Sequence, residues 1–222
     1  WINDLKKVSK SPSVFLANEF FDALPIKQFF KKENKWFESF IISKNKNLQF
    51  FEKKINLLSI EKIIERKVKK NINFIEHSPL AFKKLNEISN IVKKQNGGLL
   101  ILDYGYENKK MFNSLQSVKN HKKNNFLENI YQSDITHMIN FYYYREKIKK
   151  LSIDSVKITS QREFLLKMGI IERAEIITKR LSFSKKTDVY LRLKRLIDKR
   201  EMGSLFRVLF ATNKRNNFKL GF

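Results

Sequence analysis

A helical segment that leads directly into a strand with apolar side chains on both faces is the feature that most constrains the fold. The segment after Ser78, a residue type that caps helix N-termini, carries apolar side chains at helical spacing as far as Lys94. Gly97 and Gly98 are expected to close this helix, and Leu99–Leu102 follows as a continuous apolar run. Strands of this kind are typical of sheets covered by helices on both faces. The pattern predicts an α/β fold with a parallel sheet.

Other segments also have a recognisable period. Residues 13–17 form a short apolar run that predicts a buried strand. Residues 26–56 alternate between apolar and polar side chains, which predicts antiparallel strands. Residues 106–133 are polar and poorly periodic, which indicates a long loop of the kind that is often functional. Further helices are expected at 60–70, 140–150, 161–169 and 187–197, and further strands at 153–158 and 205–211. Asn140 can cap the second of these helices, and Ser160 with Glu163 fits a capping box at the start of the third.

The net charge of +24 has two interpretations. A polyanionic partner such as nucleic acid would explain it, but such sites favour Arg for bidentate contacts and stacking. Of the 46 basic residues, 36 are Lys and 10 are Arg, and the Lys residues are spread over the whole chain. Lys, Asn, Ile and Phe are all abundant and all have A/T-dominated codons, so drift in base composition is the favoured explanation and no nucleic-acid partner is expected.

Composition and motifs exclude several classes of function. The chain has no Cys, so disulfides, thiolate nucleophiles and thiolate metal sites are ruled out. No apolar run approaches the length of a membrane span. His77, His121 and His137 lack metal-ligand spacing, so no metal is expected. The sequence also contains no glycine-rich phosphate-binding motif.

The strongest candidates for chemistry are polar residues directly after two predicted parallel strands. Asn18, Glu19 and Asp22 follow the first of these strands. Asp103 and Tyr104 follow the second. Ligands of open α/β sheets bind outside the carboxyl ends of strands, so the two groups are expected to meet at one crevice. The alternative is that these residues only cap the following turns.

Eight short strings, in the right order along nearly the whole chain, resemble the MidA family of S-adenosylmethionine-dependent methyltransferases. That family includes a mitochondrial complex I assembly factor that acts on arginine. The strings are Ala17–Pro25, Glu76–Pro79, Gly97–Tyr106, Leu115–His121, Asp134–Thr136, Gln161–Ile170, Met202–Leu209 and Gly221–Phe222. Two departures concern the long loop: Met138 stands where the family usually has His, and Ser114 where it has Thr.

The resemblance implies a Rossmann-like class I methyltransferase fold that is incomplete on its N-terminal side. Residues 1–222 would be the carboxyl-terminal part of one methyltransferase domain, with residues 26–56 as an inserted antiparallel β segment. The glycine-rich loop and the acidic residue that hold S-adenosylmethionine in the family have no match here. They are expected upstream of Trp1, so this chain alone is expected to bind the cofactor weakly.

The resemblance also suggests roles for the candidate residues. Glu19 and Asp22 are expected to grip a substrate guanidinium, while Asn18 orients the loop or accepts from the substrate. Asp103 and Tyr104 are expected to line the opposite wall of the substrate pocket. Further substrate-binding residues are expected at Gln28, His121 and Asp134.

The implied function is methylation of a protein arginine, with a respiratory complex I subunit as the implied target. The implied location is the cytoplasm in a bacterium or the mitochondrial matrix in a eukaryote. Two alternatives remain open: a non-catalytic assembly protein that retains the fold, and a basic nucleic-acid-binding protein. The upstream coding sequence would distinguish the first, and the salt dependence of binding would distinguish the second.

Overall fold

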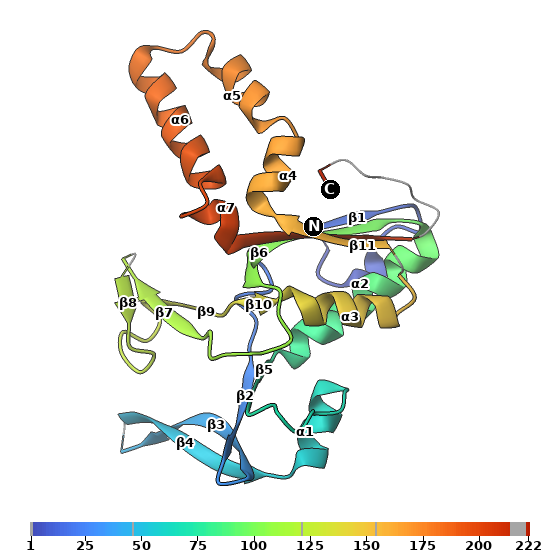
Figure 1. Cartoon of the computed structure of the whole chain (residues 1–222), viewed down its shortest axis with the longest axis vertical. Coiled ribbons are helices and arrows are strands. Elements are labelled where there is room, and N and C mark those ends of the chain that lie inside the picture. The colour runs from blue at the N-terminus through green and yellow to red at the C-terminus, as the bar shows by residue number, and fades with distance from the viewer. Residues whose placement is uncertain (1, 46, 121, 154, 214–220) are drawn as a thin grey trace. The chain divides into compact units, whose positions relative to one another are not determined.

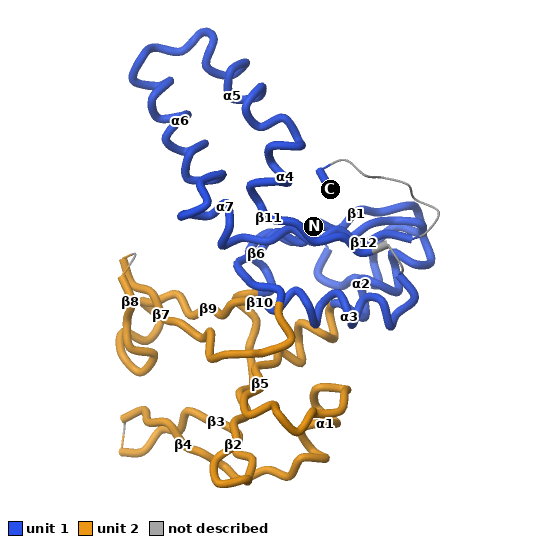
Figure 2. The backbone as a smooth tube through the Cα atoms, viewed as in Figure 1, with its two compact units in different colours: residues 1–21, 85–107, 139–222 blue, residues 22–84, 108–138 orange. Residues whose placement is uncertain are grey.

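A computed structural model describes residues 2–45, 47–120, 122–153, 155–213 and 221–222 (Figure 1). Its internal contacts divide the chain into two compact units (Figure 2). Unit 1 comprises residues 1–21, 85–107 and 139–222, and unit 2 comprises residues 22–84 and 108–138.

Unit 1 is built on a mixed sheet with the strand order β1-β6-β12-β11. These strands are β1 (Val14–Asn18), β6 (Gly98–Tyr106), β12 (Phe206–Thr212) and β11 (Ser155–Ser160), and the short β10 (Ile139–Asn140) also pairs with β6. β1 and β6 run parallel, as the sequence predicts. β12 is antiparallel to both β6 and β11, so the sheet is mixed rather than parallel throughout.

Helices pack against this sheet and extend from it. They are the part of α2 (Pro79–Gln95) after Lys84, α3 (Phe141–Lys150), α4 (Gln161–Lys167), α5 (Ile170–Thr178), α6 (Phe183–Ile197) and α7 (Met202–Leu205), with a short 3₁₀ turn at Leu5–Lys7. α3 contacts β6, β11 and β12, while α4 and α7 contact β11 and β12. The core includes Leu85, Val92, Leu99, Ile101, Phe141, Ile148, Val208 and Leu209.

The helix starts follow local sequence chemistry. Ser78 Oγ accepts from Ala81 N at 3.2 Å, which confirms the predicted cap of α2. Asn140 caps α3, and Ser160 with Glu163 forms the expected capping box of α4. The expected start of a helix near 187 is wrong, because α6 already begins at Phe183.

The end of α2 differs from the prediction in an informative way. Asn96, not a glycine, takes the left-handed conformation after the helix, with φ 57°. Gly97 serves close packing instead, because a Cβ on it would lie 2.1 Å from Ser13 O. The adjacent Gly98 N donates to that same oxygen at 3.0 Å, so the two glycines bring α2 tightly against the start of β1.

Unit 2 contains two antiparallel sheets. The first has the order β4-β3-β2-β5, and its strands are β2 (Lys27–Lys32), β3 (Lys35–Lys44), β4 (Asn47–Ile55) and β5 (Phe74–His77). The predicted antiparallel pairing within 26–56 is confirmed. The expected helix at 60–70 is instead α1 (Leu57–Ile64), which ends where Glu65 adopts φ 54°.

The second sheet of unit 2 forms where the sequence predicted only a loop. Its order is β8-β7-β9, with β7 (Gln116–Lys119), β8 (Lys122–Asn124) and β9 (Asp134–Thr136). These strands are three or four residues long and mostly polar, so they carry little periodic signal.

Candidate functional site

The carboxyl end of β1 in unit 1 presents polar and aromatic side chains to solvent. Asn18 and Glu19 are exposed, and Phe20 is 44% exposed. Glu19 has φ 45°, in the left-handed region that residues with a Cβ seldom occupy. Its backbone N–H donates to Leu102 O at 3.0 Å, which continues the ladder with β6 by one residue before the chain turns. Asn18, Glu19 and Phe20 are called the β1 lip below.

A buried carboxylate on β6 holds this turn in place. Asp103 is fully buried, and its Oδ2 accepts from Phe21 N at 3.0 Å. Its Oδ1 accepts from Tyr104 N at 2.9 Å. Phe21 is also fully buried, and its ring lies edge-on to those of Phe20 and Tyr144, with centroids 5.1 and 5.4 Å away. The lip is therefore anchored by one ionisable group and an aromatic cluster.

The β1 lip has the chemistry of a cation-binding edge. Asn18 Nδ2 lies 3.4 Å from Glu19 Oε1, so the amide and the carboxylate lie side by side. A carboxylate can accept two parallel hydrogen bonds from a guanidinium, and an aromatic ring can attract a cation to its face. No ion pair joins Glu19 to another described residue.

Unit 2 contains a separate polar cluster around Glu76 on β5. Gln28 Nε2 donates to Glu76 Oε2 at 2.7 Å and to Asn113 Oδ1 at 2.8 Å. Ser114 Oγ donates to Glu76 Oε1, and Ser114 N lies 3.3 Å from Glu76 Oε2. Met138 N in turn donates to Ser114 Oγ at 2.9 Å. The cluster ties β2, β5 and the segments on either side of the second sheet to one carboxylate.

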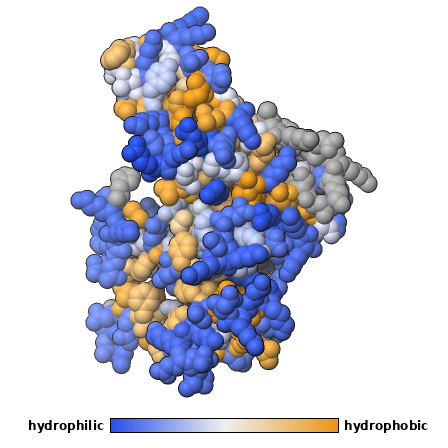
Figure 3. All heavy atoms as spheres, viewed as in Figure 1, coloured by the Kyte–Doolittle hydropathy of each residue, from blue (hydrophilic) through white to orange (hydrophobic). Residues whose placement is uncertain are grey.

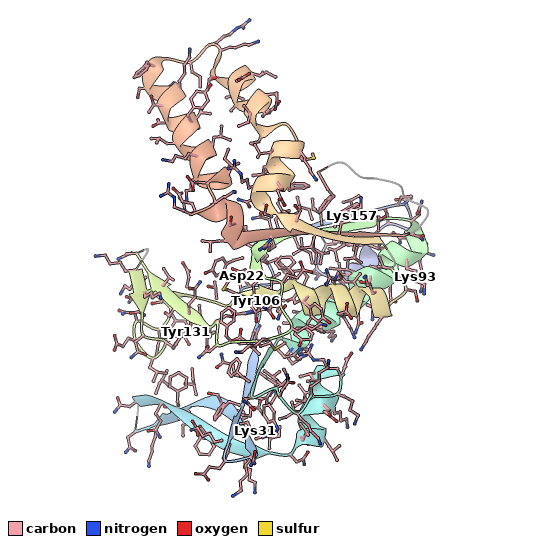
Figure 4. The ribbon with its side chains drawn as sticks, viewed as in Figure 1. Asp22, Lys31, Lys93, Tyr106, Tyr131 and Lys157 are labelled. Carbon is pink, nitrogen blue, oxygen red and sulfur yellow. The ribbon has the colours of Figure 1, made fainter. Side chains whose placement is uncertain are left out.

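Asp22 and His137 are adjacent in the same unit. Asp22 is 8% exposed and labelled in Figure 4, and its backbone oxygen accepts from His137 N at 3.0 Å. His137 is 5% exposed, and its Nε2 has no hydrogen-bond partner among the residues that the structure describes. Its Nδ1 lies 3.4 Å from Met138 O. A buried imidazole with one nitrogen unsatisfied is costly, so this position is a candidate for contact with a bound group.

The remaining predicted residues are placed as follows. Tyr104 is half-buried, with its ring centroid 6.0 Å from that of Phe206. Asp134 is exposed at the start of β9 in unit 2. His121 lies outside the described residues. Within the described ranges, no group of three or more His, Asp or Glu side chains could hold a metal ion.

Sequence reasoning gave no role to Phe20, His137 or the pair Glu76 and Ser114. An apolar residue at a strand end is expected to lie in the core, so only the exposure of Phe20 in the structure identifies it as a candidate binding residue. Glu76 belongs to one of the quoted strings, but its role as an acceptor for Gln28 and Ser114 depends on segments far apart in the chain.

Comparison with known sequences identifies the family. A family model described as "Putative S-adenosyl-L-methionine-dependent methyltransferase" matches residues 1–159. A protein arginine methyltransferase NDUFAF7 homolog of Caenorhabditis elegans is 31% identical over 179 residues, which cover 78% of this chain and 41% of that protein. Protein arginine methyltransferase NDUFAF7 of Danio rerio is 28% identical and covers 96% of this chain and 50% of its own length. Both relatives are named as mitochondrial, and the chain spans about half the length of the curated relatives it matches.

Solved structures agree on the fold. A Burkholderia thailandensis protein crystallised with S-adenosyl-homocysteine superposes with a TM-score of 0.80 at 18% identity, over 100% of this chain and 58% of that one. A second structure from the same organism gives a TM-score of 0.80 over 97% of this chain and 59% of that one. No helix in the described part of the chain is long and apolar enough to cross a bilayer. The chain belongs to the family of S-adenosylmethionine-dependent methyltransferases defined by that model.

Proposed function

We propose that this chain forms the substrate side of a methyltransferase that transfers a methyl group to a protein arginine. The observation that carries the proposal is the exposed Glu19 carboxylate, held beside Asn18 and Phe20 at the end of a parallel strand. Ligands of open α/β sheets bind at this edge. The names of the relatives, which are protein arginine methyltransferases, support arginine as the substrate.

The role of the β1 lip is to position a guanidinium that is a poor nucleophile because it is protonated at neutral pH. Glu19 accepts hydrogen bonds from two guanidinium nitrogens, which fixes the plane of the group and leaves the third nitrogen to react. The Phe20 ring offers a face to the same cation. Holding the nitrogen in line with the methyl carbon supplies most of the rate enhancement in such displacements.

S-adenosylmethionine supplies an electrophilic methyl group on a sulfonium when it is bound. The residues of the β1 lip suit the positive charge of the sulfonium, because a carboxylate, an amide oxygen and an aromatic face all attract cations. Asn18 and Phe20 are the residues that would face the sulfonium. Glu19 then stabilises the guanidinium charge, and the proton that the methylated nitrogen releases passes to solvent at this exposed strand end.

The other candidates have supporting roles in this proposal. Asp103 acts through the backbone, because each of its oxygens accepts from an N–H in or beside the lip. In unit 2, Asp22, Gln28 and Asp134 are proposed to contact the protein substrate, with Tyr104 of unit 1 lining the lip. A respiratory complex I subunit is the substrate that the family resemblance suggests.

The test is the substitution Glu19→Gln, which keeps size and hydrogen bonding but removes the charge. We expect methyl transfer to arginine to fall at least about tenfold, or roughly 1.4 kcal/mol of transition-state stabilisation. The measurement is transfer of labelled methyl groups to a protein substrate by the complete protein, with mass spectrometry to identify the modified residue.

Glu33→Gln is the matched control. Glu33 is also an exposed glutamate with a left-handed backbone, at φ 47°, but it lies in the turn between β2 and β3. Its substitution should leave the rate unchanged. Equal rates for wild type and Glu19→Gln would remove Glu19 from the site, and no transfer by any variant would favour a non-catalytic assembly protein.

A further inference from the structure

The hairpin of α5 and α6 ends in a tip that is both cationic and apolar. In Figure 1 the two helices lie side by side and extend away from the sheet of unit 1, and Figure 3 shows orange side chains among blue ones along them. The tip comprises residues 179–186, which are the connection 179–182 and the first turn of α6. They include the cations Lys179, Arg180, Lys185 and Lys186 and no acidic residue.

An exposed aromatic residue lies between these cations in the sequence. Phe183, the first residue of α6, is 87% exposed. On α5, Ile176 and Ile177 are 61% and 45% exposed just before the tip. None of the four cations forms an ion pair with another described residue.

Base-composition drift does not account for this arrangement. Lys185 and Lys186 lie in or next to the first turn of α6, which contains no acidic residue. A helix N-terminus carries partial positive charge, so cations there cost rather than add stability. Ser182, the N-cap residue, makes no side-chain capping hydrogen bond either. The start of α6 is therefore less stable than it could be, and it also exposes apolar side chains. This combination is typical of functional surfaces.

We propose that the tip docks on the surface of an anionic lipid bilayer. Cations next to a bilayer gain energy from anionic headgroups, and apolar side chains gain energy from entering the boundary between headgroups and acyl chains. A nucleic acid would explain the cations and could stack on Phe183, but it offers nothing to Ile176 and Ile177.

The primary experiment is co-flotation of the chain with vesicles of phosphatidylcholine, alone or with about one third phosphatidylglycerol. We expect binding to the anionic vesicles and little to the neutral ones. Phe183→Ser leaves the net charge unchanged and should weaken binding at least about tenfold, because a large apolar side chain no longer enters the bilayer.

The substitution Lys185→Glu distinguishes an effect on vesicle binding from an effect on folding. It should weaken vesicle binding about fivefold or more, since each cation near an anionic surface contributes about 1 kcal/mol. The same change places Glu at the third position after Ser182, which completes a capping box, so the thermal midpoint should not fall. A loss of binding therefore reports on docking.

The matched control is the double variant Lys69→Glu with Lys70→Glu. Both residues are exposed in unit 2 and lie outside its helices and strands. This variant removes more charge than Lys185→Glu but should change vesicle binding by less than about twofold. An equal or larger loss in the control, or unchanged binding by Phe183→Ser, would mean that net charge alone drives adsorption and would overturn the proposal.

A second readout locates the contact. Phe183→Trp should show a blue shift of tryptophan emission with anionic vesicles that is larger than the shift of wild type measured in parallel. The chain has two tryptophans of its own, Trp1 and Trp36, and the wild-type measurement accounts for the emission of both. No extra shift would show that the tip stays in water, and it would overturn the proposal even if the chain binds vesicles through another surface.

Discussion

At the scale of single residues, two carboxyl groups of unit 1 serve different purposes. Glu19 is exposed and has no ion-pair partner among the described residues, whereas Asp103 is fully buried and accepts from two backbone N–H groups. The first arrangement leaves a charge available to a ligand. The second uses a buried carboxyl group to hold a turn, because each of its oxygens accepts from a backbone N–H.

Asp103→Asn tests this difference through stability. One carboxylate oxygen becomes an NH₂ group that faces a backbone N–H, so a hydrogen bond is lost and two donors are opposed. We expect the free energy of unfolding to fall by about 2 kcal/mol, as for other buried hydrogen bonds to charged groups. Denaturant unfolding provides the measurement.

Asp188→Asn is the control for that substitution. Asp188 is exposed on α6 and makes no side-chain hydrogen bond to another described residue. Its replacement should change stability by less than about 0.5 kcal/mol. If Asp103→Asn is equally mild, the carboxylate does not hold the turn.

At the scale of elements, helix ends show where local chemistry acts alone. The capping box of α4 needs only Ser160 and Glu163. The pKa of the Glu163 carboxyl lies below its ordinary value, first because Thr159 Oγ1 donates to it at 2.6 Å and next because Ser160 N donates to it. A lowered pKa in the folded state means that the carboxylate stabilises the fold above its unfolded pKa, and this stabilisation disappears as the pH falls through the folded value.

Glu163→Gln should therefore have a pH-dependent effect. At pH 7 we expect a loss of a few tenths of a kcal/mol, since the group is exposed and Gln can still complete a capping box. Wild type and variant should converge only as the pH falls below the ordinary range of Glu and through the lowered pKa of Glu163. Unfolding curves at several pH values measure the difference.

Glu175→Gln controls for the general effect of removing a negative charge. Glu175 is exposed on α5, and its carboxylate makes no hydrogen bond to another described residue. Its substitution should show no convergence at low pH. A constant difference between wild type and Glu163→Gln would contradict the assigned cause.

At the scale of the whole molecule, the net charge of +24 indicates a specific binding surface only where cations lie next to exposed apolar side chains. At the α5–α6 tip, the cations lie on both sides of the exposed Phe183 in the sequence. Lys185 and Lys186 also lie near the N-terminus of α6, where the helix dipole disfavours positive charge. Elsewhere, Lys69 and Lys70 are exposed with no exposed large apolar side chain beside them in the sequence. General charge of this kind attracts any polyanion weakly and in a salt-dependent way.

We therefore expect duplex DNA to bind weakly and without a preferred surface. Charge reversal of Lys53 with Lys54 and of Lys69 with Lys70 should lower affinity at low salt by similar factors, and binding should disappear near physiological salt. Fluorescence anisotropy with a labelled duplex measures both. A much larger loss for one pair would point to a defined nucleic-acid site.

The sequence by itself determined the features that depend on neighbouring residues. Periodicity predicted the strand at 99–102, and local hydrogen-bonding chemistry predicted the caps at Ser78, Asn140 and Ser160, because both signals arise within one or two turns of chain. The order of eight short strings indicated the methyltransferase family, which the family match confirms.

Only the tertiary structure decided which of the predicted polar residues are exposed and can contact a ligand. Asp103 and Glu19 were both predicted to follow parallel strands, yet Asp103 lies within β6 and is fully buried, whereas Glu19 follows β1 and is exposed. The short strands of residues 116–136 and the partners of Glu76 were likewise beyond prediction. The physical reason is that burial and hydrogen-bond partners at these positions depend on residues far along the chain, such as the 82-residue separation between Phe21 and Asp103, which no local pattern records.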